Sequence, residues 1–197
     1  MSSLTPRQIK AKQTKSKILE SAFDLFSKKA FENITVDEII KRSGTSKGAF
    51  YTHFKSKYEI FLEKFKEIDG FYEEFIHSLS EELSYSEKLL RLSEAQMIYI
   101  KNNWGKELFR NLYMNALSSN HNYFLDENRS LYKIINKFVI KGQEIGEFKK
   151  GLLADEITML ITRCMRGALY DWCICDDLDL VMETKKFIRT LIEGLKE

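Results

Sequence analysis

The sequence has almost no proline and little cysteine. Pro6 is the one proline among 197 residues. Because proline removes a backbone N–H and clashes with the preceding turn, its near absence leaves the chain free to form long helices. The three cysteines, Cys164, Cys173 and Cys175, are odd in number and all lie late in the chain, which excludes a disulfide framework. We interpret them as free thiols in the core.

Long apolar runs and metal-binding patterns are also missing. No apolar stretch approaches the roughly 20 residues that cross a bilayer, so we expect no membrane partner. The N-terminal segment carries Arg7 and four lysines where a signal peptide has an apolar core, and we predict a cytoplasmic chain. The three histidines are scattered, and Cys-x-Cys is not the zinc spacing. No serine or cysteine has an evident base partner that would activate it as a nucleophile. From these absences together we predict no metal, no cofactor and no enzymatic activity.

The charge that is present is unevenly distributed. The whole chain has a net charge of +2. Residues 1–60 contain twelve basic and six acidic side chains, a net charge of +6, which leaves −4 for the remainder. A basic segment joined to an acidic one indicates an anionic partner for the basic segment. A solvated basic surface is the alternative interpretation, and charge alone does not decide between the two.

Apolar residues recur at helical spacing through nearly the whole chain. The pattern predicts about nine helices and no strand. Three pairs have the spacing of a capping box, in which a helix-starting hydroxyl and a side chain three residues later each bond the other's backbone: Thr35 and Glu38, Ser56 and Glu59, Ser84 and Glu87. The predicted helices span residues 14–30, 35–44, 46–54, 57–83, 84–103, 106–118, 126–145 and two further segments that end the chain. A polar loop is expected at 118–122, and the fold class is all-α.

Residues 35–57 have the pattern of a helix-turn-helix: a short helix, a turn at Gly44 and a second short helix. The apolar residues of both short helices are expected to face helix 14–30 in a three-helix core. The second helix then leaves a small, polar and basic surface outside, made of Ser46, Lys47, Gly48, Tyr51 and Thr52. A glycine-centred turn alone is a weak signal, but a basic N-terminal arm precedes it that can follow a DNA backbone.

The stretch from Ile34 to Lys57 resembles the DNA-binding signature of the TetR (tetracycline-repressor) family. The preceding helix, with Ile18, Ala22 and Phe26, is similar to the same family's first helix. The resemblance covers about residues 14–62. It implies that double-stranded DNA is bound by Thr35, Thr45, Ser46, Lys47, Gly48, Tyr51, Thr52, His53 and Lys57. Within that set, Lys57 is expected to hold a phosphate at the start of the fourth helix, and Thr52 is a candidate for sequence readout.

The resemblance also implies two domains and a dimer. Residues 1–57 are expected to form the arm and the helix-turn-helix domain, and residues 58–197 a helical ligand-binding and dimerisation domain. Two subunits would join their last two helices in a four-helix bundle, with an interface that includes Leu160, Cys164, Leu169, Trp172, Phe187 and Leu191. The alternative is that these residues are buried inside a monomer.

The middle of the chain is rich in large aromatic residues, which are suited to an apolar ligand cavity but more often form plain core. Candidates for contact with an unknown small-molecule effector are Trp104, Phe109, Tyr113, Phe138 and Arg166. The sequence therefore predicts a ligand-responsive regulator, a repressor that binds a palindromic operator as a homodimer and is released by a small molecule. The long helix 57–83 would transmit the signal. The alternative is a DNA-binding protein of the same fold without ligand control, architectural or linked to division.

Overall fold

The structure, a computed structural model, describes residues 5–118 and 123–196. Within them the chain forms nine α-helices, two short 3-10 helices and no strand beyond one isolated bridge between Phe148 and Lys196. The all-α prediction is confirmed. The elements are α1 (Pro6–Phe26), η1 (Phe31–Asn33), α2 (Val36–Ser43), α3 (Lys47–His53), α4 (Lys57–His77), α5 (Tyr85–Asn103), α6 (Gly105–Ser118), η2 (Tyr123–Leu125), α7 (Ser130–Glu144), α8 (Ala154–Ile174) and α9 (Leu180–Leu195).

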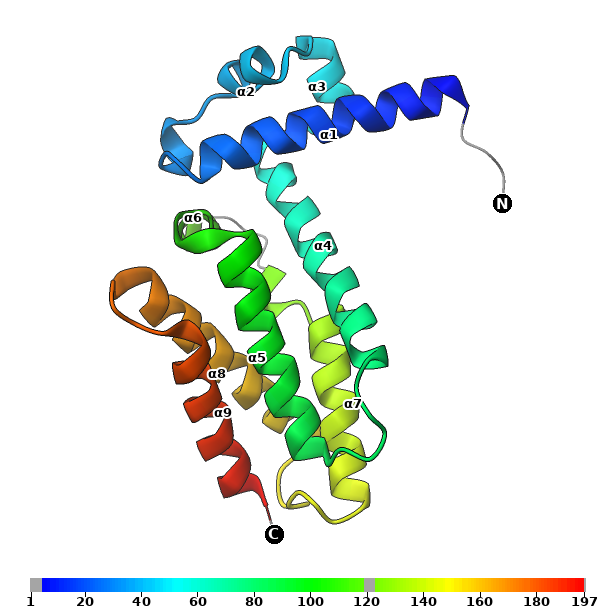
Figure 1. Cartoon of the computed structure of the whole chain (residues 1–197), viewed down its shortest axis with the longest axis vertical. Coiled ribbons are helices and arrows are strands. Elements are labelled where there is room, and N and C mark those ends of the chain that lie inside the picture. Colours follow the sequence, from blue (N-terminus) through cyan, green and yellow to red (C-terminus); the bar gives the residue numbers. More distant parts are fainter. Residues whose placement is uncertain (1–4, 119–122, 197) are drawn as a thin grey trace.

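The helices form two regions joined by α4 (Figure 1). The head, α1 to α3, lies across one end of the molecule, with α1 roughly perpendicular to the long axis. The body, α5 to α9, is a bundle in which α5, α7, α8 and α9 run along that axis. α4 descends from the head along the body. None of the described helices is both long and apolar enough to cross a bilayer.

Several helix boundaries differ from the predicted ones: α1 ends at Phe26 rather than residue 30, and α7 begins at Ser130 rather than residue 126. Two larger differences have a local cause. α1 begins at Pro6 rather than residue 14, because Thr5 and Gln8 form a capping box and proline is tolerated in the first turn. The predicted basic arm is therefore the first half of α1. α4 ends at His77 rather than residue 83; the Ser78 hydroxyl donates to the Phe75 carbonyl at 2.6 Å, an alternative to continuing the helix. Residues 119–122 of the predicted loop at 118–122 lie outside the described residues.

The predicted capping boxes are complete in only one case. Ser84 and Glu87 bond each other's backbone as expected. Thr35 accepts a hydrogen bond from the Glu38 amide at 3.1 Å, but the Glu38 carboxylate pairs with Lys29 instead of turning back. Similarly, Ser56 accepts from the Glu59 amide, while the Glu59 carboxylate accepts from the Lys55 amide.

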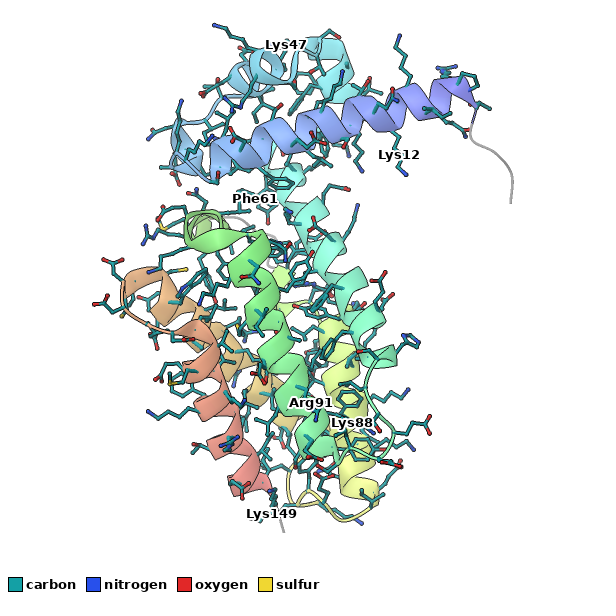
Figure 2. All side chains as sticks on the ribbon, in the orientation of Figure 1. Lys12, Lys47, Phe61, Lys88, Arg91 and Lys149 are labelled. Carbon is teal, nitrogen blue, oxygen red and sulfur yellow. The ribbon has the colours of Figure 1, made fainter. Side chains whose placement is uncertain are left out.

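One continuous apolar core runs from the head into the body. At the junction, the Phe61 ring of α4 stacks on Phe26 of α1 at 4.6 Å between ring centroids and also contacts Phe31. Figure 2 shows Phe61 where α4 leaves the head. The predicted domain boundary at residue 57 thus falls one turn before a residue that still belongs to the core of the head.

Candidate nucleic-acid interface and effector cavity

α3 is held in place by its own apolar side. Ser46 caps the helix by accepting from the Ala49 amide at 3.1 Å. Phe50 and Phe54 are buried, and α3 packs against α1 and α2. Gly44, with φ of 63°, makes the turn from α2, a backbone conformation that glycine adopts without strain. Gly44 and the Ser46 cap therefore fix the two ends of the turn. The side of α3 opposite Phe50 and Phe54 is left uncovered.

The uncovered side of α3 carries most of the predicted DNA-binding residues. Ser46, Lys47, Gly48 and Thr52 are exposed, and Tyr51 is 49% exposed. Figure 2 shows Lys47 on the side of the head that faces away from the body. The Lys47 ammonium lies 3.5 Å from Asp37, a long and exposed contact that leaves it available.

A second property of this side is its lack of bulk. A Cβ atom added to Gly48 would meet no protein atom within 4 Å, so the fold itself does not require glycine there. Gly48 instead leaves the first turn of α3 flat on the solvent side. The fold requirement lies at Gly44, where the positive φ disfavours any side chain.

The remaining predicted DNA contacts differ in availability. Thr35 is exposed at the start of α2, whereas Thr45 and His53 are half-buried, and Thr45 shares a hydrogen bond with Ser43 at 2.8 Å. The Lys57 ammonium turns inward and donates to the carbonyls of Phe31 at 2.5 Å and Ile34 at 2.7 Å.

The Lys57 side chain therefore supports the backbone of the head. Burial lowers the pKa of its ammonium, and the ion lies over the Phe31 ring at 4.2 Å. The two carbonyls belong to the 3-10 turn between α1 and α2, and the Phe31 carbonyl also accepts from the Ile34 amide at 3.2 Å. The Lys57 ammonium is directed to these carbonyls in the structure, and its contact with a phosphate stays a prediction.

Several basic side chains of the head are neutralised within it. Lys28 and Arg42 both pair with Asp24, and Lys15 reaches Glu63 of α4 at 2.8 Å. The hydrogen bond from Lys28 holds the pKa of Asp24 below its usual range. Between residues 5 and 56, the basic residues that form no ion pair with any described residue are Arg7, Lys10, Lys12, Lys17, Lys41 and Lys55. These cations give the head its surplus positive charge.

The body encloses a cavity between α4, α5, α6, α7 and α8. Its volume is about 50 Å³, and seven aromatic side chains line it, among them Trp104, Phe109 and Phe124. Phe65 of α4 stacks on Tyr123 with 5.0 Å between ring centroids. Arg129 also lines the cavity and is bound by both carboxylate oxygens of Asp69, at 2.9 and 3.2 Å. The cavity is mostly apolar with a few polar groups, as ligand sites are.

Residues 18–63 match the family described as "Bacterial regulatory proteins, tetR family". QacR of Staphylococcus aureus, an HTH-type transcriptional regulator, is 49% identical over 49 residues, which is 25% of this chain and 26% of QacR. The chain belongs to the TetR family. It is thus a transcriptional regulator with a DNA-binding helix-turn-helix domain.

The similarity continues, more weakly, along the rest of this TetR-family chain. The fatty acid metabolism regulator protein of Bacillus subtilis is 22% identical over 181 residues, covering 90% of this chain and 93% of that protein. The structure of Thermus thermophilus FadR in complex with lauroyl-CoA has a TM-score of 0.73 at 20% identity and covers 91% of this chain and 94% of FadR. CprB of S. coelicolor has a TM-score of 0.63 at 17% identity, covering 95% and 90%. At these identities the solved structures share the fold.

The predicted effector contacts of this TetR-family regulator separate into three places. Trp104, Phe109 and Arg166 line the cavity. Tyr113 stands behind it and donates from its hydroxyl to the Arg166 carbonyl at 2.8 Å. Phe138 lies in a separate surface groove with Ile76 and Tyr85, so we leave it out of the effector site.

The predicted interface residues also separate. Leu169 and Trp172 are only 2% and 7% exposed, because their side chains fill the protomer's own core, and we correct their assignment to the interface. Leu160 and Cys164 lie on the opposite side of α8, which is not fully covered. Phe187 and Leu191, half-buried on α9, belong to the helix packed beside it. Ile174, 60% exposed at the end of α8, extends the same apolar surface and was not predicted.

Asn111 of α6 is a functional candidate that the sequence pattern did not reveal. It is 7% exposed and makes three hydrogen bonds to the head. Its amide nitrogen donates to the carbonyls of Phe26 at 2.8 Å and Lys29 at 3.1 Å, and its oxygen accepts from the Phe31 amide at 3.1 Å. A polar residue on an amphipathic helix gives no sign that its partners lie some 80 residues earlier. Asn111 ties the body to the end of α1.

Cys173 and the described histidines are residue types that occur at reactive-thiol and metal sites. Burial raises the pKa of the Cys173 thiol to about 11, which keeps it protonated and unreactive at neutral pH. Glu74 and His77 of α4 have the Glu-x-x-His spacing that occurs in di-metal bundles. Among the described residues, however, no three metal-binding side chains come together.

Proposed function

We propose that this chain is a ligand-controlled repressor that binds a palindromic operator as a homodimer. The observation that carries the proposal is the uncovered side of α3, where Lys47, Gly48 and Tyr51 are exposed and Lys47 lies on the side of the head that faces away from the body. A helix of this kind enters the major groove, with phosphate contacts fixing its position and side chains at its start reaching base edges. Thr52 donates to the Gly48 carbonyl at 2.8 Å, and its methyl group stays outside as a candidate for contact with thymine.

Dimerisation is supported by the exposed apolar surface of α8 and α9. Leu160, Cys164 and Ile174 recur at helical spacing on one side of α8, and Phe187 and Leu191 do so on α9. Exposed apolar side chains that gather on one side of two neighbouring helices mark a candidate interface. Pairing two copies across it would build a four-helix bundle and place two heads at a fixed separation. Two linked heads gain affinity only when both reach their half-sites.

Control by a ligand is supported by the way the cavity is joined to the head. Phe65 and Ile68 of α4 and Phe109 of α6 line the cavity. The same two helices hold the head, α4 through Phe61 and α6 through Asn111. A ligand that widens the cavity therefore displaces both attachments, changes the separation of the heads and favours the form that does not bind DNA. The lauroyl-CoA in FadR and the fatty acid metabolism regulator make acyl compounds suitable first effectors to test.

The test begins with selection of bound duplexes from a random DNA pool by the full-length protein. We expect a palindrome with two half-sites centred about one helical turn, or a multiple of it, apart. Sedimentation should give a dimer, and Leu160→Glu should yield a monomer that binds the selected site much more weakly. Recovery of no palindrome, or a Leu160→Glu protein that still binds as tightly, would contradict the proposal.

A second candidate is a DNA-binding protein of the same fold without ligand control. The observation that favours it is the cavity volume of about 50 Å³, against roughly 300–1,000 Å³ for typical ligand pockets. The two candidates differ in the behaviour of the DNA complex. Release of operator DNA by some member of a panel of acyl and aromatic compounds supports the repressor, and release by none supports the second candidate.

A further inference from the structure

The cavity of the body continues into an outer cleft. The cleft has a volume of about 280 Å³ and shares Phe124, Tyr132, Thr162 and Arg166 with the cavity. Its other walls are Leu125, Glu127, Met159 and Arg163, and both compartments are mostly apolar. The inner compartment alone is too small for an organic ligand, whereas the two together approach the lower end of the usual range of roughly 300–1,000 Å³. Arg166 lies at the junction, so its side chain faces any ligand that occupies both.

Arg166 has no anionic partner among residues 5–118 and 123–196. A guanidinium carries five N–H donors, and the one described bond is from Nη1 to the Phe124 carbonyl at 2.8 Å. No carboxylate of a described residue lies within 4 Å of it, in contrast to Arg129, which Asp69 binds. Burial lowers the pKa of the Arg166 guanidinium, and the neighbouring positive charge of Arg163 lowers it further. A half-buried cation beside a second cation is costly unless an anion joins them.

Two further polar groups in the inner compartment are unsatisfied. Gln96 and Trp104 are 7% and 5% exposed, and neither the Gln96 Oε1 nor the Trp104 Nε1 has a hydrogen-bond partner. Both side chains line the cavity, with Ile100 between them on α5. Eight residues of helix separate them by about 12 Å. Buried polar groups normally have a hydrogen-bond partner. A purely hydrocarbon ligand would leave the Gln96 and Trp104 groups without one.

We infer that the cavity and the outer cleft together bind a compact organic acid. Its carboxylate, or another oxyanion, binds Arg166 at the junction, its apolar body lies against Phe124, Tyr132 and Met159, and an oxygen of the body accepts from Trp104. The inference rests on the proposed function, since it names the chemical class of the effector. The same chemistry is offered by a free acid and by an acyl group carried on a phosphate-bearing carrier, as in the lauroyl-CoA of FadR.

The test is calorimetry on the full-length protein without DNA, with acids paired to alcohols of the same skeleton. The probes are 4-hydroxyphenylacetate and 4-hydroxyphenylethanol, whose ring hydroxyl supplies the oxygen of the body, octanoate and octanol, which lack that oxygen, and lauroyl-CoA. We expect the acid of at least one pair, or lauroyl-CoA, to bind. Charge-assisted hydrogen bonds of this kind change affinity by about tenfold or more, so the acid should bind at least that much more tightly than its alcohol. Arg166→Gln should abolish the preference, and Arg166→Lys should restore part of it.

Arg91→Gln is the matched control, because Arg91 is exposed on α5 and outside both compartments. It should leave binding unchanged, and thermal melts should show that the Arg166 variants remain folded. Binding of lauroyl-CoA alone, lost in Arg166→Gln, identifies the carrier-borne acyl group as the source. Alcohols that bind as tightly as their acids, acids that bind Arg166→Gln equally well, or no binding by any probe would overturn the inference.

A separate measurement of operator release distinguishes this inference from the proposed function. An acid that binds through Arg166 but does not release DNA leaves the site intact and contradicts the ligand-controlled repressor. Release of DNA by a neutral compound, unaffected by Arg166→Gln, leaves the repressor intact and contradicts the assignment of an acid.

Discussion

The head and the body use their cations in opposite ways. The head carries Lys10, Lys12 and Lys47 on its surface, where water screens them and an external polyanion can reach them. The body holds Arg129 and Arg166 half-buried beside a cavity, one paired with Asp69 and the other without an acid. A surface cation attracts a polyanion over a long range, and salt weakens this attraction. A half-buried cation instead favours a single anionic group placed directly beside it. Composition cannot distinguish the two, because both are simply basic residues.

Salt should separate the two regions by the largest margin. Operator binding is expected to fall by about 10³- to 10⁵-fold between 50 and 200 mM salt if the dimer makes six to ten phosphate contacts. Binding of an acid to the body should change far less, because buried charges are screened weakly. Fluorescence anisotropy with operator DNA and calorimetry with the acid measure the two. Equal salt dependence at both sites would contradict the division between surface and buried cations.

The link between the regions should be broken by Asn111→Leu. The substitution leaves the Phe31 amide and the Phe26 and Lys29 carbonyls without their partner, and each buried group left unsatisfied costs about 1–3 kcal/mol. We expect the free energy of unfolding in urea to fall by at least about 2 kcal/mol. Asn103→Leu is the control, since exposed Asn103 bonds only the Tyr99 carbonyl of its own helix. An Asn111→Leu protein as stable as that control would show that the link contributes little.

Within the head, Lys47 and Lys57 should respond differently to loss of charge. Lys47→Ala is expected to weaken operator binding by about tenfold, or about 1.4 kcal/mol, and to reduce the log–log salt slope by about 1 for each phosphate that the lysine no longer neutralises. Lys57→Met should instead lower stability, because its ammonium compensates two backbone carbonyls. Urea titration and a salt series on both variants make the comparison. A reduced salt slope for Lys57→Met at unchanged stability would support its phosphate role.

Alanine substitutions at the two glycines of the helix-turn-helix should have the smallest effects, but with opposite signs for stability. Gly48→Ala is expected to raise stability by about 0.5–1 kcal/mol, because glycine is a poor helix former, and to weaken DNA binding, because the added methyl group stands on the uncovered side of α3. Gly44→Ala should lower stability by about 1–2 kcal/mol at its positive φ. Thermal melts and anisotropy report both effects. Undiminished DNA affinity in Gly48→Ala would remove the first turn of α3 from the interface.

Local sequence was sufficient for most of the head. The hydroxyl caps, the turn at Gly44 and the apolar spacing of Phe50 and Phe54 act over a few residues, so α2 and α3 could be predicted almost to the residue. The start of α1 was missed because its basic character was interpreted as an unstructured arm, although Thr5 and Gln8 have the spacing of a capping box.

In the body, the sequence identified which residues are apolar or aromatic, but not whether each side chain faces the core, the cavity or the surface. Helical periodicity marks one apolar side, yet α8 has two, and Leu169 and Leu160 were assigned together although one is buried and the other is exposed. Phe138 was placed with the effector residues on its aromatic character, and only packing assigns it to another groove. Distinguishing a cavity wall from core requires knowledge of every neighbour.

By itself, the sequence determined the all-α fold, the helix-turn-helix and the family, since each depends on spacing within a short segment. The tertiary structure alone decided three things: that Lys57 serves the head, that Asn111 joins head to body, and that Arg166 lines the cavity without an ion pair to any described carboxylate. Each is a contact between residues distant in the chain. Burial and partnership arise only when separate helices meet, and no local pattern carries that information.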